Sequence, residues 1–148
     1  DSDTRYPAPD SETALVAPPS VIASADLRGN EYAWKPKDFP AALEEAARLG
    51  FRCIGGQFQF RIPGGTLEMY WLKSDAPPRE PGEAWPVYVG RCAEMVRGEF
   101  DSLLAATDYL REAESWTFIR EKMANERLDP LQHLVFVAYF ENEHGESF

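Results

Sequence analysis

The clearest alternation of hydrophobic and polar positions lies in residues 51–72. Two sets of hydrophobic residues alternate with polar neighbours: Phe58, Phe60 and Ile62 first, and then Leu67, Met69 and Trp71. Between them, Pro63 supplies the fixed φ of a tight turn and Gly64 the positive φ that follows it. The pattern therefore predicts a β-hairpin over residues 51–72.

The pair Gly55-Gly56 interrupts the first strand of this hairpin. Phe51 and Cys53 have the opposite parity from Phe58 and Phe60, so a regular strand would place the two sets on opposite faces. One extra residue at the glycine pair would return both sets to one face. A phosphate-binding loop would need a helix after the glycines, whereas here a strand continues. The sequence therefore predicts a β-bulge.

Helical spacing of hydrophobic residues appears in three segments. The first follows Asp38, a possible N-cap, and ends at Gly50. The second begins at Pro86, and its inward stripe is Val89, Cys92, Val96, Phe100 and Leu103. The third runs from Asp108 to about Asn125, with Trp116, Ile119 and Met123 directed inward. Three helices are therefore expected.

The remaining segments complete the predicted architecture. Residues 20–24 (SVIAS) favour a short strand, residues 30–37 a loop, and residues 131–140 a strand buried on both faces. The fold class predicted is α+β, with a mainly antiparallel sheet and about three helices packed on it. A flexible proline-rich lead-in (1–19), one domain (20–140) and an acidic tail (141–148) are the predicted divisions.

The net charge of −10 is concentrated in three segments. Residues 1–12 carry −3, residues 141–148 another −3, and residues 98–114 carry −4. The two ends are expected to be mobile, so the third segment is the acidic surface within the fold. A field of this sign repels nucleic acid and attracts basic partners.

Several classes of site find no support in the sequence. Cys53 and Cys92 are 39 residues apart, which favours two buried thiols over a metal site or a disulfide. His133 and His144 have no partner at triad spacing, and no metal or cofactor motif is present. No run reaches the ~18 apolar residues of a membrane helix. The chain begins with Asp1, so it is either processed or a piece of something longer; the cytoplasm is the favoured compartment, with the periplasm left open.

Residues 30–71 resemble a family of bacterial immunity proteins from polymorphic toxin systems. The matching features are Glu31-Tyr32-Ala33, the alanine- and leucine-rich helix over 41–49, Ile54-Gly55-Gly56, and Trp71. Trp34 and Gln57 depart from the family pattern, which has leucine and aspartate there. The resemblance implies a small protein that binds and neutralises a cognate toxin and catalyses nothing.

The acidic segment and two aromatic residues are the candidate partner-binding surface. It comprises Glu99, Asp101, Asp108, Glu112 and Glu114, with Trp85 and Tyr88 as aromatic anchors. The alternative is a charged helix end that only maintains solubility, with Asp108 as a helix cap and Asp101 paired with Arg97. Two other functions stay open: a small enzyme or ligand-binding protein with a cleft beside the 73–85 loop, using Glu31, Tyr32 or Glu68, and a structural subunit.

Overall fold

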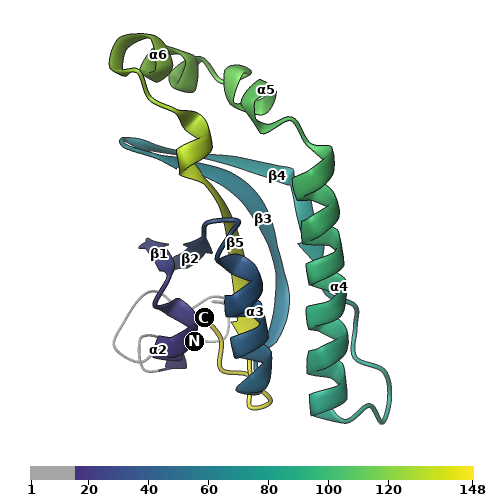
Figure 1. Ribbon diagram of the computed structural model, residues 1–148. Coiled ribbons are helices and arrows are strands. Elements are labelled where there is room, and N and C mark those ends of the chain that lie inside the picture. The colour runs from purple at the N-terminus through teal and green to yellow at the C-terminus, as the bar shows by residue number, and fades with distance from the viewer. Residues whose placement is uncertain (1–15) are drawn as a thin grey trace.

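The protein, seen in a computed structural model that describes residues 16–148, forms one antiparallel sheet of five strands (Figure 1). The strands are β1 (Ala25–Arg28), β2 (Glu31–Trp34), β3 (Arg52–Ile62), β4 (Gly65–Asp75) and β5 (Leu134–Glu141). Their order across the sheet is β1-β2-β5-β3-β4, so β5 is central and β4 and β1 are the edges.

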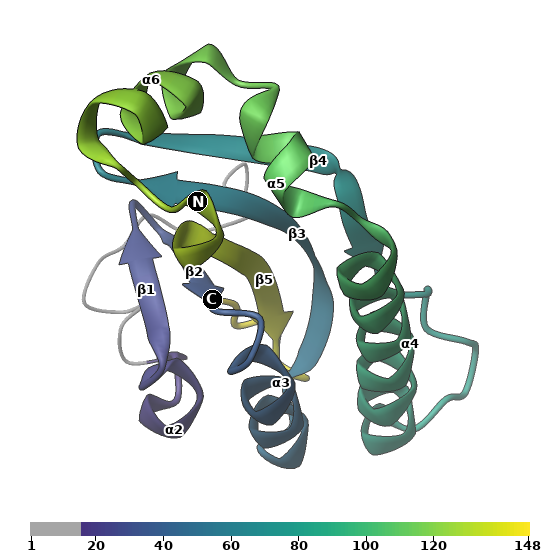
Figure 2. The same cartoon turned by 45° about the horizontal axis from the view of Figure 1, so that its top comes forward.

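The helices lie mainly on one side of this sheet. They are α2 (Pro19–Ile22), α3 (Phe39–Arg48), α4 (Trp85–Ala106), α5 (Tyr109–Glu114) and α6 (Thr117–Glu126), with the 3-10 helix η1 (Pro130–His133) before β5. Figure 1 shows α3 and α4 side by side against the sheet, and Figure 2 shows α5 and α6 crossing near the β3–β4 hairpin. The predicted α+β fold, a single domain, is confirmed.

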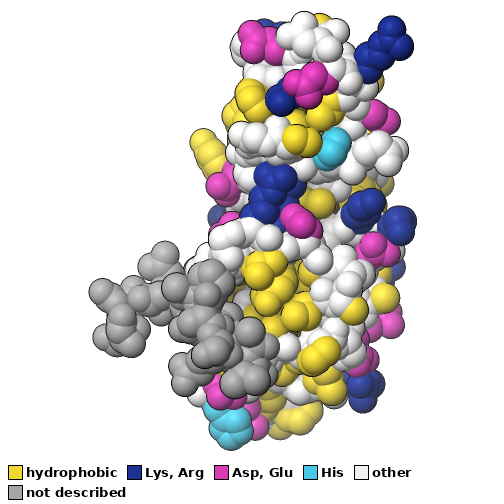
Figure 3. Space-filling view, turned by 90° about the vertical axis from the view of Figure 1, so that its left-hand side faces the viewer, with side chains coloured by type: hydrophobic (Ala, Val, Ile, Leu, Met, Phe, Trp, Pro, Cys, Tyr) yellow, Lys and Arg dark blue, Asp and Glu magenta, His cyan; other side chains and the backbone are white. Residues whose placement is uncertain are grey.

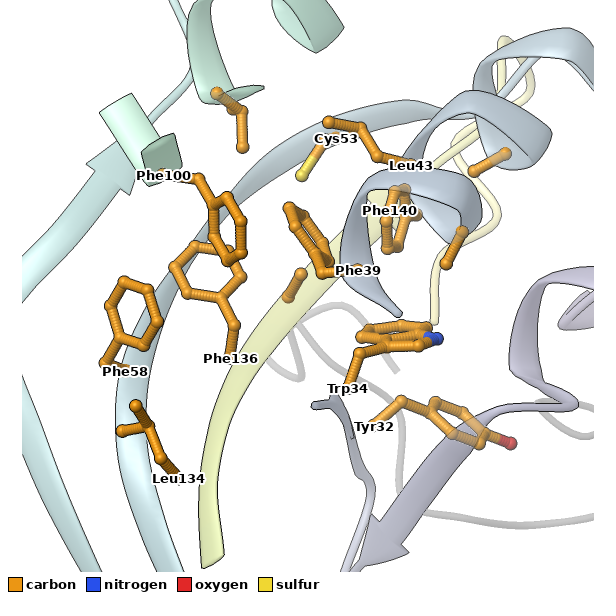
Figure 4. Packing of buried hydrophobic residues seen from close by; sticks show 14 of the residues in the cluster. Tyr32, Trp34, Phe39, Leu43, Cys53, Phe58, Phe100, Leu134, Phe136 and Phe140 are labelled. Carbon is orange, nitrogen blue, oxygen red and sulfur yellow. The ribbon is translucent and has the colours of Figure 1, made fainter. Parts of the chain in front are cut away.

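Aromatic rings fill the space between the helices and the sheet (Figure 4). Phe136 of β5 lies at the centre, with its ring centroid 4.7 Å from that of Phe39, 4.9 Å from Phe58 and 5.1 Å from Phe100. All four side chains are buried. The core thus joins the central strand to β3, α3 and α4 through one aromatic cluster.

The predicted hairpin and its bulge are both present. β3 and β4 pair around a turn in which Gly64 has a φ of 89°. Against β5, the register of β3 shifts by one residue between Cys53 and Gly55. Cys53 and Phe58 consequently face the same core, both fully buried. The bulge therefore places both sets of hydrophobic residues on one face of β3, as the sequence pattern predicts.

Gly56 is essential to the contact between β3 and the central strand. A Cβ at this position would collide with the Val137 carbonyl oxygen and lie 2.5 Å from Cε2 of Phe136. We therefore expect Gly56→Ala to lower the free energy of unfolding by about 2 kcal/mol, as for other overpacked cores. Chemical denaturation measures this change. Gly98→Ala, at a helical position with open space around it, is the matched control and should leave stability unchanged or raise it. An unchanged midpoint for Gly56→Ala would contradict this account.

A second irregularity lies in β4 and changes the side on which Trp71 sits. Gln57 pairs with Lys73, but the next residue, Phe58, pairs with Met69, so three residues of β4 have no partner on β3. Simple alternation predicts Trp71 on the same face as Met69. Instead Met69 is buried and Trp71 is 49% exposed, because the three extra residues break the alternation of β4: Tyr70 and Trp71 turn outward and Leu72 packs on the core.

Three local predictions are wrong. Residues 19–22 form the short helix α2 rather than a strand, and residues 31–34 of the predicted loop form the strand β2, which pairs with β1. The third predicted helix is broken: Trp116 has an extended backbone and separates α5 from α6. Each of these features depends on contacts with distant parts of the chain; β2, for example, pairs with β5.

The two ends of the predicted domain also differ from expectation. Residues 1–15 of the predicted lead-in lie outside the described part of the chain, but Ala17 is already buried against the core. At the other end, Phe148 is 4% exposed, and its backbone exchanges hydrogen bonds with that of Phe140. The prediction of a mobile acidic tail is therefore wrong, because its terminal ring adds apolar burial that holds the segment in place.

Candidate functional site

The predicted acidic surface is not one continuous cluster. Glu99 and Asp101 point to different sides of α4, since residues two apart on a helix are separated by about 200°. Glu99 accepts a hydrogen bond from Ser74 of β4. Asp101 pairs with Arg97 at 3.1 Å, and Arg97 also lies 3.9 Å from Glu44 of α3. Both carboxylates therefore bond to other groups of the chain. For Asp101, the partner is Arg97, as the alternative interpretation predicts.

The other three acids lie in α5 or at its N-cap. The Asp108 side chain accepts a hydrogen bond from the backbone N–H of Arg111, so it caps this helix. Glu112 is half-buried and Glu114 is exposed. The structure therefore spreads the five acids over two helices, where they contribute negative charge without forming a single contact face.

The two predicted aromatic anchors, Trp85 and Tyr88, are used internally. Tyr88 is only 4% exposed, and its hydroxyl donates to the Pro77 carbonyl at 2.7 Å. The Trp85 indole N–H donates to the Gly50 carbonyl at 2.8 Å, and its ring lies beside that of Tyr88. The prediction of Tyr88 as an exposed anchor is wrong, because it lies one helical turn before Cys92 on the buried stripe of α4.

The proline-rich loop after β4, residues 76–84, is fastened to α4. Arg91 donates to the Pro78 carbonyl and pairs with Glu83 at 2.7 Å. The hydrogen bonds from Arg91 lower the pKa of Glu83 to about 2, so this carboxylate is ionised at neutral pH. The loop is therefore attached to α4. Of the residues suggested as ligand contacts beside it, Glu31 accepts a hydrogen bond from Tyr139, Glu68 accepts one from Gln57, and Tyr32 is buried in the core.

The exposed aromatic side chains gather where β4 bulges. Tyr70 is 67% exposed and Trp71 is 49% exposed, with their rings 5.3 Å apart. The Trp71 ring also stacks on that of Trp116, which separates α5 from α6, at 6.4 Å and an interplanar angle of 16°. We call Tyr70, Trp71 and Trp116 the aromatic surface.

The aromatic surface combines rigid support with accessibility. Trp116 is half-buried and packs against the main core, so it anchors the stack from below. β4 is an edge strand, and bulges at sheet edges commonly redirect side chains outward. Glu68 and Glu114 lie two residues from Tyr70 and Trp116, respectively, and both are exposed. The result is a large apolar surface with carboxylates close to it in the chain.

Sequence reasoning missed Trp71 as a surface residue because it treated β4 as a regular strand, in which Trp71 shares the face of Met69. The adjacent pair Tyr70-Trp71 carries a partial signal, since two neighbouring aromatics in an alternating strand cannot both face the core. No glycine marks this second bulge, unlike the first. Its position depends on the pairing of β4 with β3, which the sequence alone does not define.

Histidine and cysteine side chains often take part in catalysis or metal binding, but His133, Cys53 and Cys92 make contacts within the fold. The His133 ring lies with Nδ1 3.2 Å from the Arg61 carbonyl oxygen. Within residues 16–148, no group of three or more His, Cys, Asp or Glu side chains is placed to hold a metal ion. Cys53 and Cys92 are separate thiols, both fully buried, as the sequence predicts.

Burial makes the two thiols unreactive in the folded protein. It raises the pKa of Cys53 to about 12, so the thiolate that attacks thiol reagents is scarce at pH 8. We expect neither cysteine to react promptly with a disulfide reagent at that pH, and both to react after unfolding in denaturant. The absorbance of the released thiol measures both. Rapid release of one equivalent from the folded protein would contradict this assignment.

Within residues 16–148, every helix is too short or too polar to cross a membrane. The chain matches no family model, no curated protein and no solved structure.

Proposed function

We propose that this protein is an immunity protein that binds a cognate bacterial toxin stoichiometrically and neutralises it. The observation that carries the proposal is the exposure of Tyr70 and Trp71 on an ordered bulge of an edge strand. Tyrosine and tryptophan are enriched among the residues that dominate binding energy at protein interfaces. Their large rings lose little conformational entropy on binding, so they are efficient contacts.

The charge of the chain supports a basic partner. A net charge of −10 attracts a positively charged protein over a distance of several ångströms and raises the association rate at low salt. In this proposal, the acids of α4 and α5 act through their field, while the aromatic surface makes the close contacts. The resemblance of residues 30–71 to immunity proteins supports the same class of function.

The proposal is tested by affinity purification of the tagged full-length protein from its native host at low and high salt. The expected result is one basic protein in a one-to-one ratio, with faster association at low salt because screening shortens the reach of the charges. Recovery of the protein without any stoichiometric partner at either salt concentration would contradict the proposal.

A further inference from the structure

The sheet curves so strongly that its two edge regions meet on the face away from α3 and α4. Arg28 of β1 donates from Nη1 to the Gly65 carbonyl at 3.1 Å and to Thr66 Oγ1 at 3.0 Å. Three strands separate β1 from β4 in the sheet, yet Figure 2 shows β1 approaching the β3–β4 turn. This curvature leaves a cavity, partly open to solvent, between β1, β2, β3 and the start of β5.

A buried arginine forms the floor of this space. Arg61 of β3 is 4% exposed and donates from Nε to Gln59 at 2.7 Å. Its Nη1 donates to the Asp26 carbonyl oxygen at 2.6 Å and to the Asp26 carboxylate at 3.1 Å, and its Nη2 donates to the Glu31 carbonyl at 2.9 Å. These bonds fix the guanidinium and leave one N–H of Nη2 for another acceptor.

The cavity has a volume of about 360 Å³, within the size range of small-ligand sites. Its lining includes the cations Arg28, Lys35 and Arg61 and the carboxylate of Asp26. Figure 3, which views the molecule from this side, shows Lys and Arg side chains close to a histidine and to a hydrophobic area. The lining of the cavity is therefore positively charged, although the chain as a whole is strongly acidic.

The charges of the lining leave a net attraction for an anion. The Asp26 carboxylate is already shared, 3.1 Å from Arg61 and 4.0 Å from Arg28. Lys35 is exposed and has no acid within 4.0 Å in the part of the chain that the structure describes. His133 does not add to this attraction: because a carbonyl only accepts, its Nδ1 donates to the Arg61 carbonyl, and the Nε2 of that neutral ring is then an acceptor.

The cavity also has an apolar wall, made by Ala25, Ala33 and Val135. An inorganic ion would contact only the charged side of a space of this volume. We propose that this cavity binds a small organic phosphate monoester, whose dianionic group lies near Lys35, Arg28 and Arg61 and whose apolar body packs on this wall. Phosphate suits this arrangement because arginine and lysine both donate to its oxygens. The inference does not depend on the proposed toxin binding.

The test is a calorimetric titration of the full-length protein with phenyl phosphate, inorganic phosphate and phenol. Phenyl phosphate should bind saturably, inorganic phosphate more weakly because it lacks the apolar body, and phenol without saturation. Inorganic phosphate binding as tightly as phenyl phosphate would overturn the assignment of the apolar wall. Absence of saturation by phenyl phosphate up to about 10 mM would overturn the site itself.

Lys35→Gln tests the position of the anion without disturbing the buried floor. It should weaken phenyl phosphate binding about tenfold, the effect of losing one charge-assisted hydrogen bond. Lys37→Gln is the matched control, since Lys37 is also exposed but pairs with Asp38 and does not line the cavity. Its affinity should stay within twofold of the wild type. Equal weakening in both variants would show that only the general charge matters and would overturn the proposal.

Discussion

Truncating Phe136 to alanine is expected to lower the free energy of unfolding by about 4 kcal/mol, a large part of the stability of a domain this size. The ring is fully buried at the centre of the aromatic cluster and contacts rings from α3, α4 and β3. Its removal leaves a cavity that three different elements border, so local relaxation cannot close it easily. The midpoint and slope of denaturant unfolding measure the loss.

Phe118→Ala is the control for this change. It removes the same atoms from a side chain that is 36% exposed, on α6, and should cost about 1 kcal/mol or less. A loss below about 1.5 kcal/mol for Phe136→Ala would mean that the cluster does not organise the core as described.

Truncating Trp71 to alanine is expected to weaken partner binding about 100-fold, corresponding to ~2.7 kcal/mol. The indole is half-exposed and stacked on Trp116, so it is held in place before the partner arrives. Such preorganisation reduces the entropy lost on binding. The loss should appear mainly as faster dissociation, because the charges that steer association are unchanged. Surface plasmon resonance with the captured partner measures both rates.

Val87→Ala is the matched control for the Trp71 variant. Val87 is 61% exposed in the first turn of α4, away from the bulge of β4, so its truncation should leave the affinity unchanged. An affinity of Trp71→Ala within twofold of the wild type would contradict the assignment of the aromatic surface. Unfolding curves for both variants separate loss of contact from loss of fold.

The elements that sequence patterns predicted are those stabilised by near neighbours. The β3–β4 hairpin has a local turn at Gly64, and α4 has a continuous buried stripe. The bulge beside Gly55 was predicted because the parity of Cys53 and Phe58 requires it. By contrast, β2 is four residues long and depends on pairing with β5, about a hundred residues away, so its local pattern was too short to identify it.

The candidate binding surface was harder to predict because it depends on register. Counting charges placed Glu99 and Asp101 together, although helical geometry alone separates them around α4. Tyr88 follows the buried stripe of that helix and was nevertheless counted as an anchor. Trp71 faces outward only because three residues of β4 have no partner on β3, and nothing in the local sequence marks that shift.

The central claim, neutralisation of a toxin through the aromatic surface, is tested most directly by a growth assay. Bacteria express the captured partner together with the wild-type protein, Trp71→Ala, Val87→Ala or no second protein. We expect growth arrest by the partner alone, rescue by the wild type and by Val87→Ala, and loss of rescue with Trp71→Ala at equal protein levels. Unimpaired growth with the partner alone, or full rescue by Trp71→Ala, would contradict the account.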